Sequence, residues 1–281
     1  MKPLLFLAAV FLLLTFVGLA LWRLSDLRQD RAEVSRLLAL QPRAPAPFHP
    51  DLVAELPAPV RAYFTAMIAA GTPLHTVARI EMAGRFGIGN NESHRYLPMR
   101  AREVLAAPEG FHWAMAVPLG RGGISGSDSG RWTRFWALGL APVARAGGTD
   151  DHRRSAFGRY VAEAVFWSPA ALMPGPDVTW EALSDTTLRV AVRHGDLEQT
   201  VDVTLSAGGL PETVSLDRWS DANPDATFQL QPFGGTVSAF RDFGGFRLPT
   251  QVEAGNFFGT DAYFPFFIAE VTSISFPTAG S

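Results

Sequence analysis

The chain has 281 residues, of which 47% are hydrophobic and 18% charged, with a net charge of −3 and no cysteine. This composition provides enough apolar surface for a sizeable core, so it excludes a globally disordered chain. The absence of cysteine excludes disulfide bonds, thiolate catalysis and cysteine-based zinc sites, and the small negative charge provides no basic surface for nucleic acid.

The first predicted element is a membrane-spanning helix over residues 3–22. This segment is apolar apart from Thr15 and carries no charge, and about 20 helical residues cover about 30 Å, the thickness of a bilayer's hydrocarbon core. The alternative is a cleaved signal peptide, with Lys2 as its basic start and Gly18 and Ala20 before the cleavage site. We favour a single-pass anchor in the bacterial inner (plasma) membrane, because the apolar run is longer than the usual signal-peptide core.

The helical pattern continues past the span, and Pro42 predicts its end. We assign residues 1–41 to the transmembrane anchor and its helical extension. Residues 42–50 contain four prolines and predict an extended spacer. Residues 51–277 are expected to form one β-rich domain, because no further Pro/Gly/Ser linker divides them, and residues 51–70 should form one or two short helices at its start.

Strands dominate from Thr76 onward, because apolar and polar residues alternate there. Short turns such as His194-Gly195-Asp196 separate neighbouring strands, as in antiparallel hairpins. The predicted fold class is α+β and mainly β: a curved, half-barrel-like antiparallel sheet with a few helices, plus the N-terminal transmembrane helix. The expected strands cover residues 76–86, 99–105, 111–117, 178–183, 187–193, 199–205, 212–219, 235–242, 245–254 and 268–276.

Two segments between these strands have other patterns. Residues 120–130 are rich in glycine but lack the Lys-Ser/Thr ending of a P-loop, so we expect a structural turn or loop. Residues 150–166 predict the clearest helix of the second half, with Asp150 as its N-cap and Pro169 beyond its end.

The most specific motif of the chain begins on this helix and ends just beyond it, and it comprises Arg159, Tyr160, Glu163, Trp167 and Pro169. Arg159 and Glu163 are four residues apart and can pair on one helix face. Glu163 could act as a general acid or base or as a structural partner of Arg159. We favour the structural role, because the spacing ties no nucleophile or second carboxylate to it.

At this string, Arg-Tyr-x-x-Glu-x-x-x-Trp-x-Pro, the chain resembles a family of uncharacterised bacterial membrane-anchored proteins that share a domain of unknown function. Residues 56–64 and 110–113 support the resemblance, which covers about residues 56–277. It implies no catalytic residue. The histidines are scattered and no Gly-x-Ser-x-Gly or His-Glu-x-x-His string occurs, so we predict no catalytic residue, no metal site and no cofactor.

The β-meander, with its Ala-Gly-Gly-Leu-Pro turn, is also similar to the half-barrel of lipoprotein carriers, in which helices cover the concave apolar side. This likeness implies a domain outside the cytoplasm. The positive-inside rule favours a cytoplasmic domain instead, because several arginines follow the span: Arg23, Arg28, Arg31 and Arg36.

We therefore expect a membrane-anchored binding module for a lipid, an acyl chain or a lipidated partner in the bacterial cell envelope. A curved sheet with aromatic residues on its inner face would form an apolar groove. The candidate lining residues are Trp113, Trp132, Phe135, Trp136, Trp180 and Trp219.

A second group of aromatic residues lies close together in the sequence and is interrupted by Gly259, Asp261 and Pro265. This pattern favours a loop that contacts a membrane or a partner. The group comprises Phe257, Phe258, Tyr263, Phe264, Phe266 and Phe267.

Two alternatives stay open at this point. One is an enzyme with a dispersed site around Glu163, in which Arg159, Asp128 and His152 could take part. The other is a structural subunit of an envelope complex. Nucleic acid is not expected as a ligand, and the sequence names no protein partner.

Overall fold

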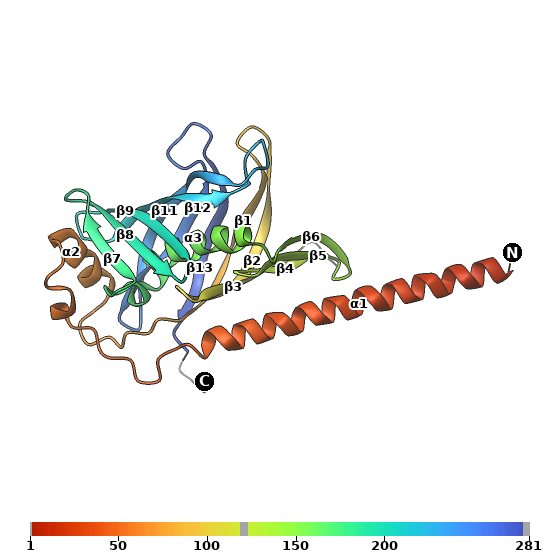
Figure 1. Cartoon of the computed structure of the whole chain (residues 1–281), viewed down its shortest axis with the longest axis horizontal. Helices are drawn as coiled ribbons and strands as arrows, with labels where there is room; N and C mark the ends of the chain where they lie inside the picture. The colour runs from red at the N-terminus through yellow and green to blue at the C-terminus, as the bar shows by residue number, and fades with distance from the viewer. Residues whose placement is uncertain (1, 119–122, 278–281) are drawn as a thin grey trace.

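The computed structural model describes residues 2–118 and 123–277 (Figure 1). Within these residues the chain forms a 13-stranded antiparallel sheet in the order β6-β5-β4-β3-β2-β1-β13-β12-β11-β10-β9-β8-β7. The chain therefore runs from the centre to the edge at β6, crosses to the opposite edge at β7, and returns until β13 pairs with β1. The strands are β1 (Ala78–Gly89), β2 (His94–Ala106), β3 (Gly110–Val117), β4 (Ile124–Ser129), β5 (Trp132–Ala137), β6 (Ala141–Gly147), β7 (Val178–Ala182), β8 (Thr187–His194), β9 (Leu197–Leu205), β10 (Pro211–Ser220), β11 (Gln229–Phe243), β12 (Phe246–Asn256) and β13 (Phe264–Ser275).

Three α-helices and two short 3-10 helices accompany the sheet in the described residues: α1 (Lys2–Leu38), η1 (Pro50–Val53), α2 (Ala58–Met67), α3 (Asp150–Trp167) and η2 (Pro169–Leu172). With a rise of about 1.5 Å per residue, α1 is about 55 Å long, and Figure 1 shows its N-terminal part projecting beyond the domain. The most apolar 18-residue window of α1 has no buried residue. Its length and composition would allow α1 to cross a membrane.

The sheet curves around α3. This helix contacts β9, β10 and β12 of one half of the sheet and β2, β3 and β6 of the other half, so it lies on the concave side. Side chains that point inward from the strands pack on α3 and α2 in one main hydrophobic core. The predicted fold class, a mainly antiparallel half-barrel with a few helices and a long apolar N-terminal helix, is confirmed.

The ends of α3 are fixed by side chains. The Thr149 side chain accepts a hydrogen bond from the His152 backbone N–H, so Thr149 is the N-cap and the prediction of Asp150 is wrong. Thr149 has the extended backbone that a cap needs, whereas Asp150 is already helical. At the other end, Pro169 has no N–H to donate to the Val165 carbonyl. The Tyr63 hydroxyl of α2 donates to that carbonyl instead, at 2.6 Å, and joins the two helices.

The glycine-rich segment differs from the prediction of a loop. Residues 124–129 form strand β4, and residues 119–122 lie outside the described residues. The alternation that identifies a strand was missing because both faces of β4 are polar: Ser127 points toward α1 and Asp128 toward α3. Strands β5 and β6 were not predicted either.

The aromatic segment after β12 also differs from the prediction. Only residues 257–263 form the connection, whereas Phe264, Phe266 and Phe267 belong to β13. Phe264 is buried, and Phe266 and Phe267 are partly buried. Pro265 lies opposite the irregularity between Ala254 and Asn256 in the pairing of β12 with β13, and a missing N–H is tolerated at such a bulge.

Candidate functional site

A cavity of about 180 Å³ lies between α3 and the concave face of the sheet. Cavities of about 150 Å³ with aliphatic and aromatic walls stay dry and bind small apolar molecules such as benzene. The space therefore suits an aromatic ring or part of one acyl chain. Its apolar lining comprises Phe86, Trp113, Phe135, Ala162, Phe166, Trp167, Val214, Leu216, Phe233, Val237, Val252, Ala254, Phe266 and Phe267.

Arg159 and two carboxylates form a polar patch in this lining. The Arg159 Nε donates to Glu163 Oε1 at 2.8 Å, and its Nη1 donates to Asp128 Oδ2 at 2.7 Å. The guanidinium also stacks near Phe111 and Trp113. Although burial lowers the pKa of Arg159, Glu163 and Asp128 raise it above its ordinary value. The predicted Arg159–Glu163 pair is thus present, with Asp128 as an additional partner from β4.

Glu103 of β2 lies behind this patch and is buried. Both of its carboxyl oxygens lack a hydrogen-bond partner among the described residues, and so does Glu163 Oε2. Burial, followed by the charge of Glu163, raises the pKa of Glu103 well above its ordinary value. A protonated Glu103 carries no charge into the core, which explains how a carboxyl group can occupy this position.

Arg218 of β10 is the other cationic residue of the cavity wall. Its Nε donates to the Ser155 carbonyl at 3.1 Å, and the guanidinium lies over the Phe233 ring. No carboxylate of residues 2–118 or 123–277 lies within 4.0 Å of this guanidinium, in contrast to Arg159. Burial lowers the pKa of Arg218 to about 10, so the side chain stays charged at neutral pH.

The six aromatic residues predicted to line a groove are divided between different places. Trp113 and Phe135 are part of the cavity lining. Trp132 and Trp136 are on the opposite, convex face of β5, because neighbouring side chains of a strand alternate. Trp180 packs against Tyr63 and Phe64 of α2, and the Trp219 indole donates to Asp151 at the start of α3.

The other predicted residues are placed as follows. Phe266 and Phe267 line the cavity. Phe258 and Tyr263 pack edge to face within the β12–β13 connection, and Phe264 lies beside Tyr96. In the α3 motif, Trp167 donates weakly to the Pro249 carbonyl at 3.4 Å and the Tyr160 hydroxyl donates to the Pro108 carbonyl. The His152 ring, at 3.0 Å from the Ser129 carbonyl, is separate from the Glu163 patch.

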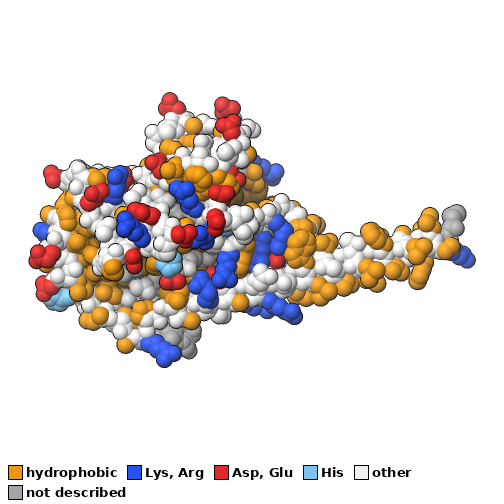
Figure 2. Space-filling model, viewed as in Figure 1, with side chains coloured by type: hydrophobic (Ala, Val, Ile, Leu, Met, Phe, Trp, Pro, Cys, Tyr) orange, Lys and Arg blue, Asp and Glu red, His pale blue; other side chains and the backbone are white. Residues whose placement is uncertain are grey.

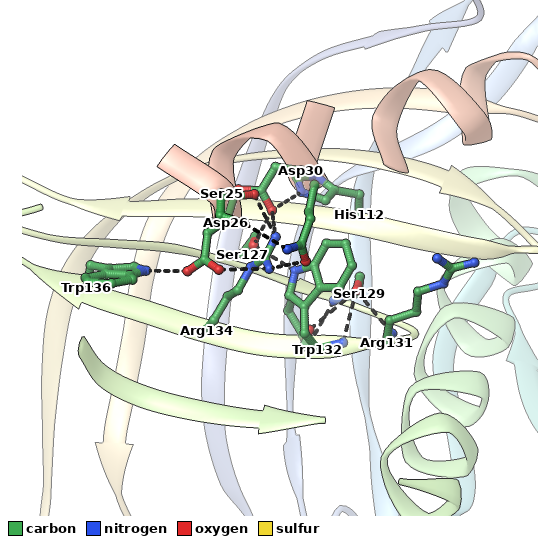
Figure 3. A network of polar contacts seen from close by, with 12 residues as sticks. Ser25, Asp26, Asp30, His112, Ser127, Ser129, Arg131, Trp132, Arg134 and Trp136 are labelled. Carbon is green, nitrogen blue, oxygen red and sulfur yellow. Dashed lines mark hydrogen bonds and ion pairs between the residues drawn. The ribbon is translucent and has the colours of Figure 1, made fainter. Parts of the chain in front are cut away.

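Residues 23–38 of α1 dock on the convex face of the sheet through a buried polar network (Figure 3). Asp26 is 1% exposed and accepts hydrogen bonds from Arg134, Trp136 and Arg145. Asp30 accepts from Arg134 at 2.9 Å. We name the contacts of Asp26 and Asp30 with β3 to β6 the docking network.

Asp30, His112 and Ser127 of this network bring together the residue types of a catalytic triad, but not its connectivity. The Ser127 hydroxyl donates to Asp30 at 2.7 Å, and His112 Nε2 contacts the same Asp30 oxygen at 3.2 Å. In a triad the histidine would lie between the other two. Although burial opposes ionisation, hydrogen bonds from His112, Ser127 and Arg134 lower the pKa of Asp30 to about 2. The arrangement holds a charged carboxylate in place and has no activated nucleophile.

Two residues of the cavity region were missed by sequence reasoning: Glu103 and Arg218. Glu103 follows Met99 and Ala101 at an inward position of β2, and Arg218 follows Val214 and Leu216 in the same way on β10. The sequence signal for Glu103 and Arg218 was therefore a charged residue at a position where the alternation of the strand predicts an apolar, inward-pointing side chain. Asp128, which the sequence analysis named as a possible member of a site around Glu163, contacts Arg159 from β4.

A comparison with protein-family models confirms the family predicted from the sequence. A family model described as "Family of unknown function (DUF6544)" matches residues 46–268. A comparison with curated proteins gave no match.

Two solved structures are similar to this chain. A LolA superfamily protein from Nitrosomonas europaea matches with a TM-score of 0.42 and 10% identity, over 78% of this chain and 92% of that one. A putative outer membrane lipoprotein-sorting protein domain from Vibrio parahaemolyticus matches with a TM-score of 0.36 and 9% identity, over 73% and 87% of the two chains.

Proposed function

The chain belongs to the DUF6544 family of unknown function, and we propose that it is a membrane-tethered binding module for an acidic amphiphile. Helix α1 anchors it in the bacterial inner membrane through residues 3–22. The half-barrel cavity receives part of the apolar chain of the ligand. The observation that carries the proposal is an aromatic-lined cavity with one cation, Arg218, that has no carboxylate partner among the described residues.

The apolar part of the ligand follows from the cavity lining. Each methylene group transferred from water to such a site contributes about 0.8 kcal/mol, or about a fourfold gain in affinity. A cavity of about 180 Å³ holds only part of a long acyl chain. We therefore expect the affinity to rise with chain length and then to level off once the space is filled.

The acidic head group follows from Arg218. A guanidinium placed in apolar surroundings without a carboxylate in contact is costly, and an anionic ligand group would lower that cost. A charge-assisted hydrogen bond contributes about 1.5–3 kcal/mol, which corresponds to about 10-fold or more in affinity. Arg159 is less available to an anionic ligand group, because its guanidinium already forms ion pairs with Glu163 and Asp128.

The proposal is tested with the full chain in lipid nanodiscs and a series of brominated saturated carboxylates. Bound bromine should quench Trp113 and Trp167, which line the cavity. Ala254→Phe places a large side chain in the cavity wall and should remove the binding, whereas Ala116→Phe, at an exposed position of β3, should not. Arg218→Gln should remove the preference for a carboxylate over an alcohol of the same chain length. Equal quenching in wild type and Ala254→Phe would exclude the cavity as the binding site.

A second candidate function is general acid–base catalysis on a ligand in the same cavity. The observation that favours it is the proximity of two carboxyl groups, Glu163 on the cavity wall and the buried Glu103 behind it, whose oxygens Glu163 Oε2, Glu103 Oε1 and Glu103 Oε2 have no hydrogen-bond partner among the described residues. A carboxyl with a raised pKa next to an ionised one is a frequent arrangement for proton transfer. Turnover of a bound carboxylate or ester that is lost in Glu163→Gln, with unchanged binding, would favour this function over simple binding.

A further inference from the structure

The hairpin formed by β5 and β6 ends in an apolar tip. Residues 137–144 read Ala-Leu-Gly-Leu-Ala-Pro-Val-Ala, without any charged or polar side chain. Leu138 is 72% exposed and Val143 is 53% exposed. We name residues 137–144 the hairpin tip. Large side chains exposed in this way usually face a partner or a membrane.

The hairpin tip also lies at an edge of the sheet, since β6 is the last strand on that side. Soluble proteins protect exposed edge strands with charges, prolines or covering elements. In β6 the first charged residue is Arg145, although Pro142 removes one free N–H group. The tip therefore carries little of the protection that contact with water would require.

The docking network fixes the hairpin beside α1. The Trp136 and Trp22 rings are 5.5 Å apart, and the Arg145 guanidinium lies 4.4 Å from the centre of the Trp22 ring. Leu138 is two residues beyond Trp136, in the turn that follows β5, and therefore lies at most about 6.6 Å further along. That distance is at most slightly more than one turn of α1, which places Leu138 between the levels of about residues 18 and 22.

The exposure of α1 agrees with this placement. Residues 2–18 are exposed, whereas Leu19 and Ala20 are partly buried, and Figure 1 shows the hairpin running alongside α1 toward its N-terminus. The tip therefore overlaps the last turn of the apolar segment, residues 3–22. Figure 2 shows basic side chains gathered where α1 leaves the domain and hydrophobic side chains along the helix beyond them.

Tryptophan and arginine mark the level of the lipid head groups in many membrane proteins. Here Trp22, Arg23, Trp136 and Arg145 form such a band around the junction. The hairpin tip lies on the side of this band toward the N-terminus of α1, the side that faces the hydrocarbon core.

We infer that the hairpin tip is a second membrane contact, inserted into the same bilayer leaflet as the last turn of the α1 span. The partner is the lipid bilayer, and the inserted residues are Leu138, Leu140 and Val143. This inference rests on the membrane tether of the proposed function, because the tip reaches the bilayer only if α1 spans it. Two attachment points would hold the domain at a fixed height and tilt above the membrane.

The absence of cysteine allows a direct test, because a single cysteine can be labelled without further substitution. The full chain is reconstituted in phosphatidylcholine vesicles with an environment-sensitive fluorophore at one position, and lipids with a spin label near the head group serve as quenchers. The three variants are Leu138→Cys, Phe16→Cys in the span, and Leu52→Cys in η1. Leu52 is 51% exposed and lies in η1, which contacts α2 at the end of the domain away from the hairpin.

We expect blue-shifted emission and loss of fluorescence at Leu138 and Phe16, and emission as in water at Leu52. Emission as in water at Leu138 together with a quenched label at Phe16 would overturn the inference and leave the tether intact. Emission as in water at both positions would overturn the tether itself, and the inference with it.

Discussion

Substitution of Asp26 should reveal how firmly α1 is docked on the sheet. Asp26 accepts hydrogen bonds from Arg134 at 3.1 Å, Arg145 at 2.8 Å and Trp136 at 2.8 Å. Asp26→Asn keeps the shape but removes the charge, and it leaves two arginines with fewer partners. Breaking a buried ion pair typically costs about 3–5 kcal/mol.

The expected loss lies at the lower end of this range, about 3 kcal/mol, because Arg134 keeps Asp30 and the Asp26 backbone carbonyl as partners. For a domain of this size, each kcal/mol corresponds to about 2–4 °C, so the melting temperature should fall by about 6–12 °C. The loss cannot exceed the free energy of docking, since α1 can also detach while the sheet stays folded. Hydrogen exchange of residues 24–38 measures this detachment directly and should accelerate in the variant.

Asp202→Asn is a matched control. Asp202 accepts two hydrogen bonds from Arg189, at 2.6 and 2.8 Å, but the two side chains are 34% and 40% exposed. Exposed pairs of this kind contribute at most about 1 kcal/mol. If Asp26→Asn changed the melting temperature and the exchange of residues 24–38 no more than Asp202→Asn does, the docking network would not be what holds α1 in place.

Three further predictions concern single groups. Acid should weaken the docking network. The pKa of Asp30 is about 2 in the folded chain against an ordinary value of 3.8, so the ionised Asp30 stabilises the fold fully above about pH 4, and this contribution is lost as the pH falls toward 2. Asp30→Asn should lack this acid-dependent loss of stability in melting experiments. Glu103 has a raised pKa, so the protonated side chain stabilises the fold below the ordinary pKa of 4.5, and this contribution is lost as the pH rises through the pKa of the folded state. Glu103→Gln should therefore melt at a higher temperature than wild type at alkaline pH. A variant that melts at a lower temperature at every pH would contradict the raised pKa. Tyr63→Phe leaves the Val165 carbonyl without a donor and should lower the free energy of unfolding by about 1–3 kcal/mol, measured by urea titration; no change would mean that water replaces the hydroxyl.

The parts of the fold that the sequence predicted are those in which one face of a strand is buried. In β8, Leu188, Val190 and Val192 are buried and alternate with more exposed residues, and β7 to β10 were all predicted from such alternation. Strands β4 to β6 were missed for the opposite reason. Their polar side chains bond to α1 on one face and to α3 on the other, and β6 is exposed. These partners are distant in sequence.

The candidate site also has one part that the sequence predicted and another part that it did not. Arg159 and Glu163 are one helical turn apart, so local spacing predicted their contact. Asp128, Glu103 and Arg218 reach the same region from three different strands. Their convergence depends on how the two halves of the sheet curve around α3, and local spacing contains no information on that curvature. Likewise, the sequence did not predict that Trp132 and Trp136 lie on the convex face, because this depends on how β5 pairs with its neighbouring strands.

Native mass spectrometry of the full chain purified from its host in a mild detergent tests the proposed binding function most directly. We predict that wild type retains an acidic amphiphile, and that Ala254→Phe, with its cavity filled, does not. Arg218→Gln should retain less of it or exchange it for a neutral lipid. A wild-type chain without any bound amphiphile, or an equal amount bound to Ala254→Phe, would contradict the proposal that the half-barrel cavity is a binding site.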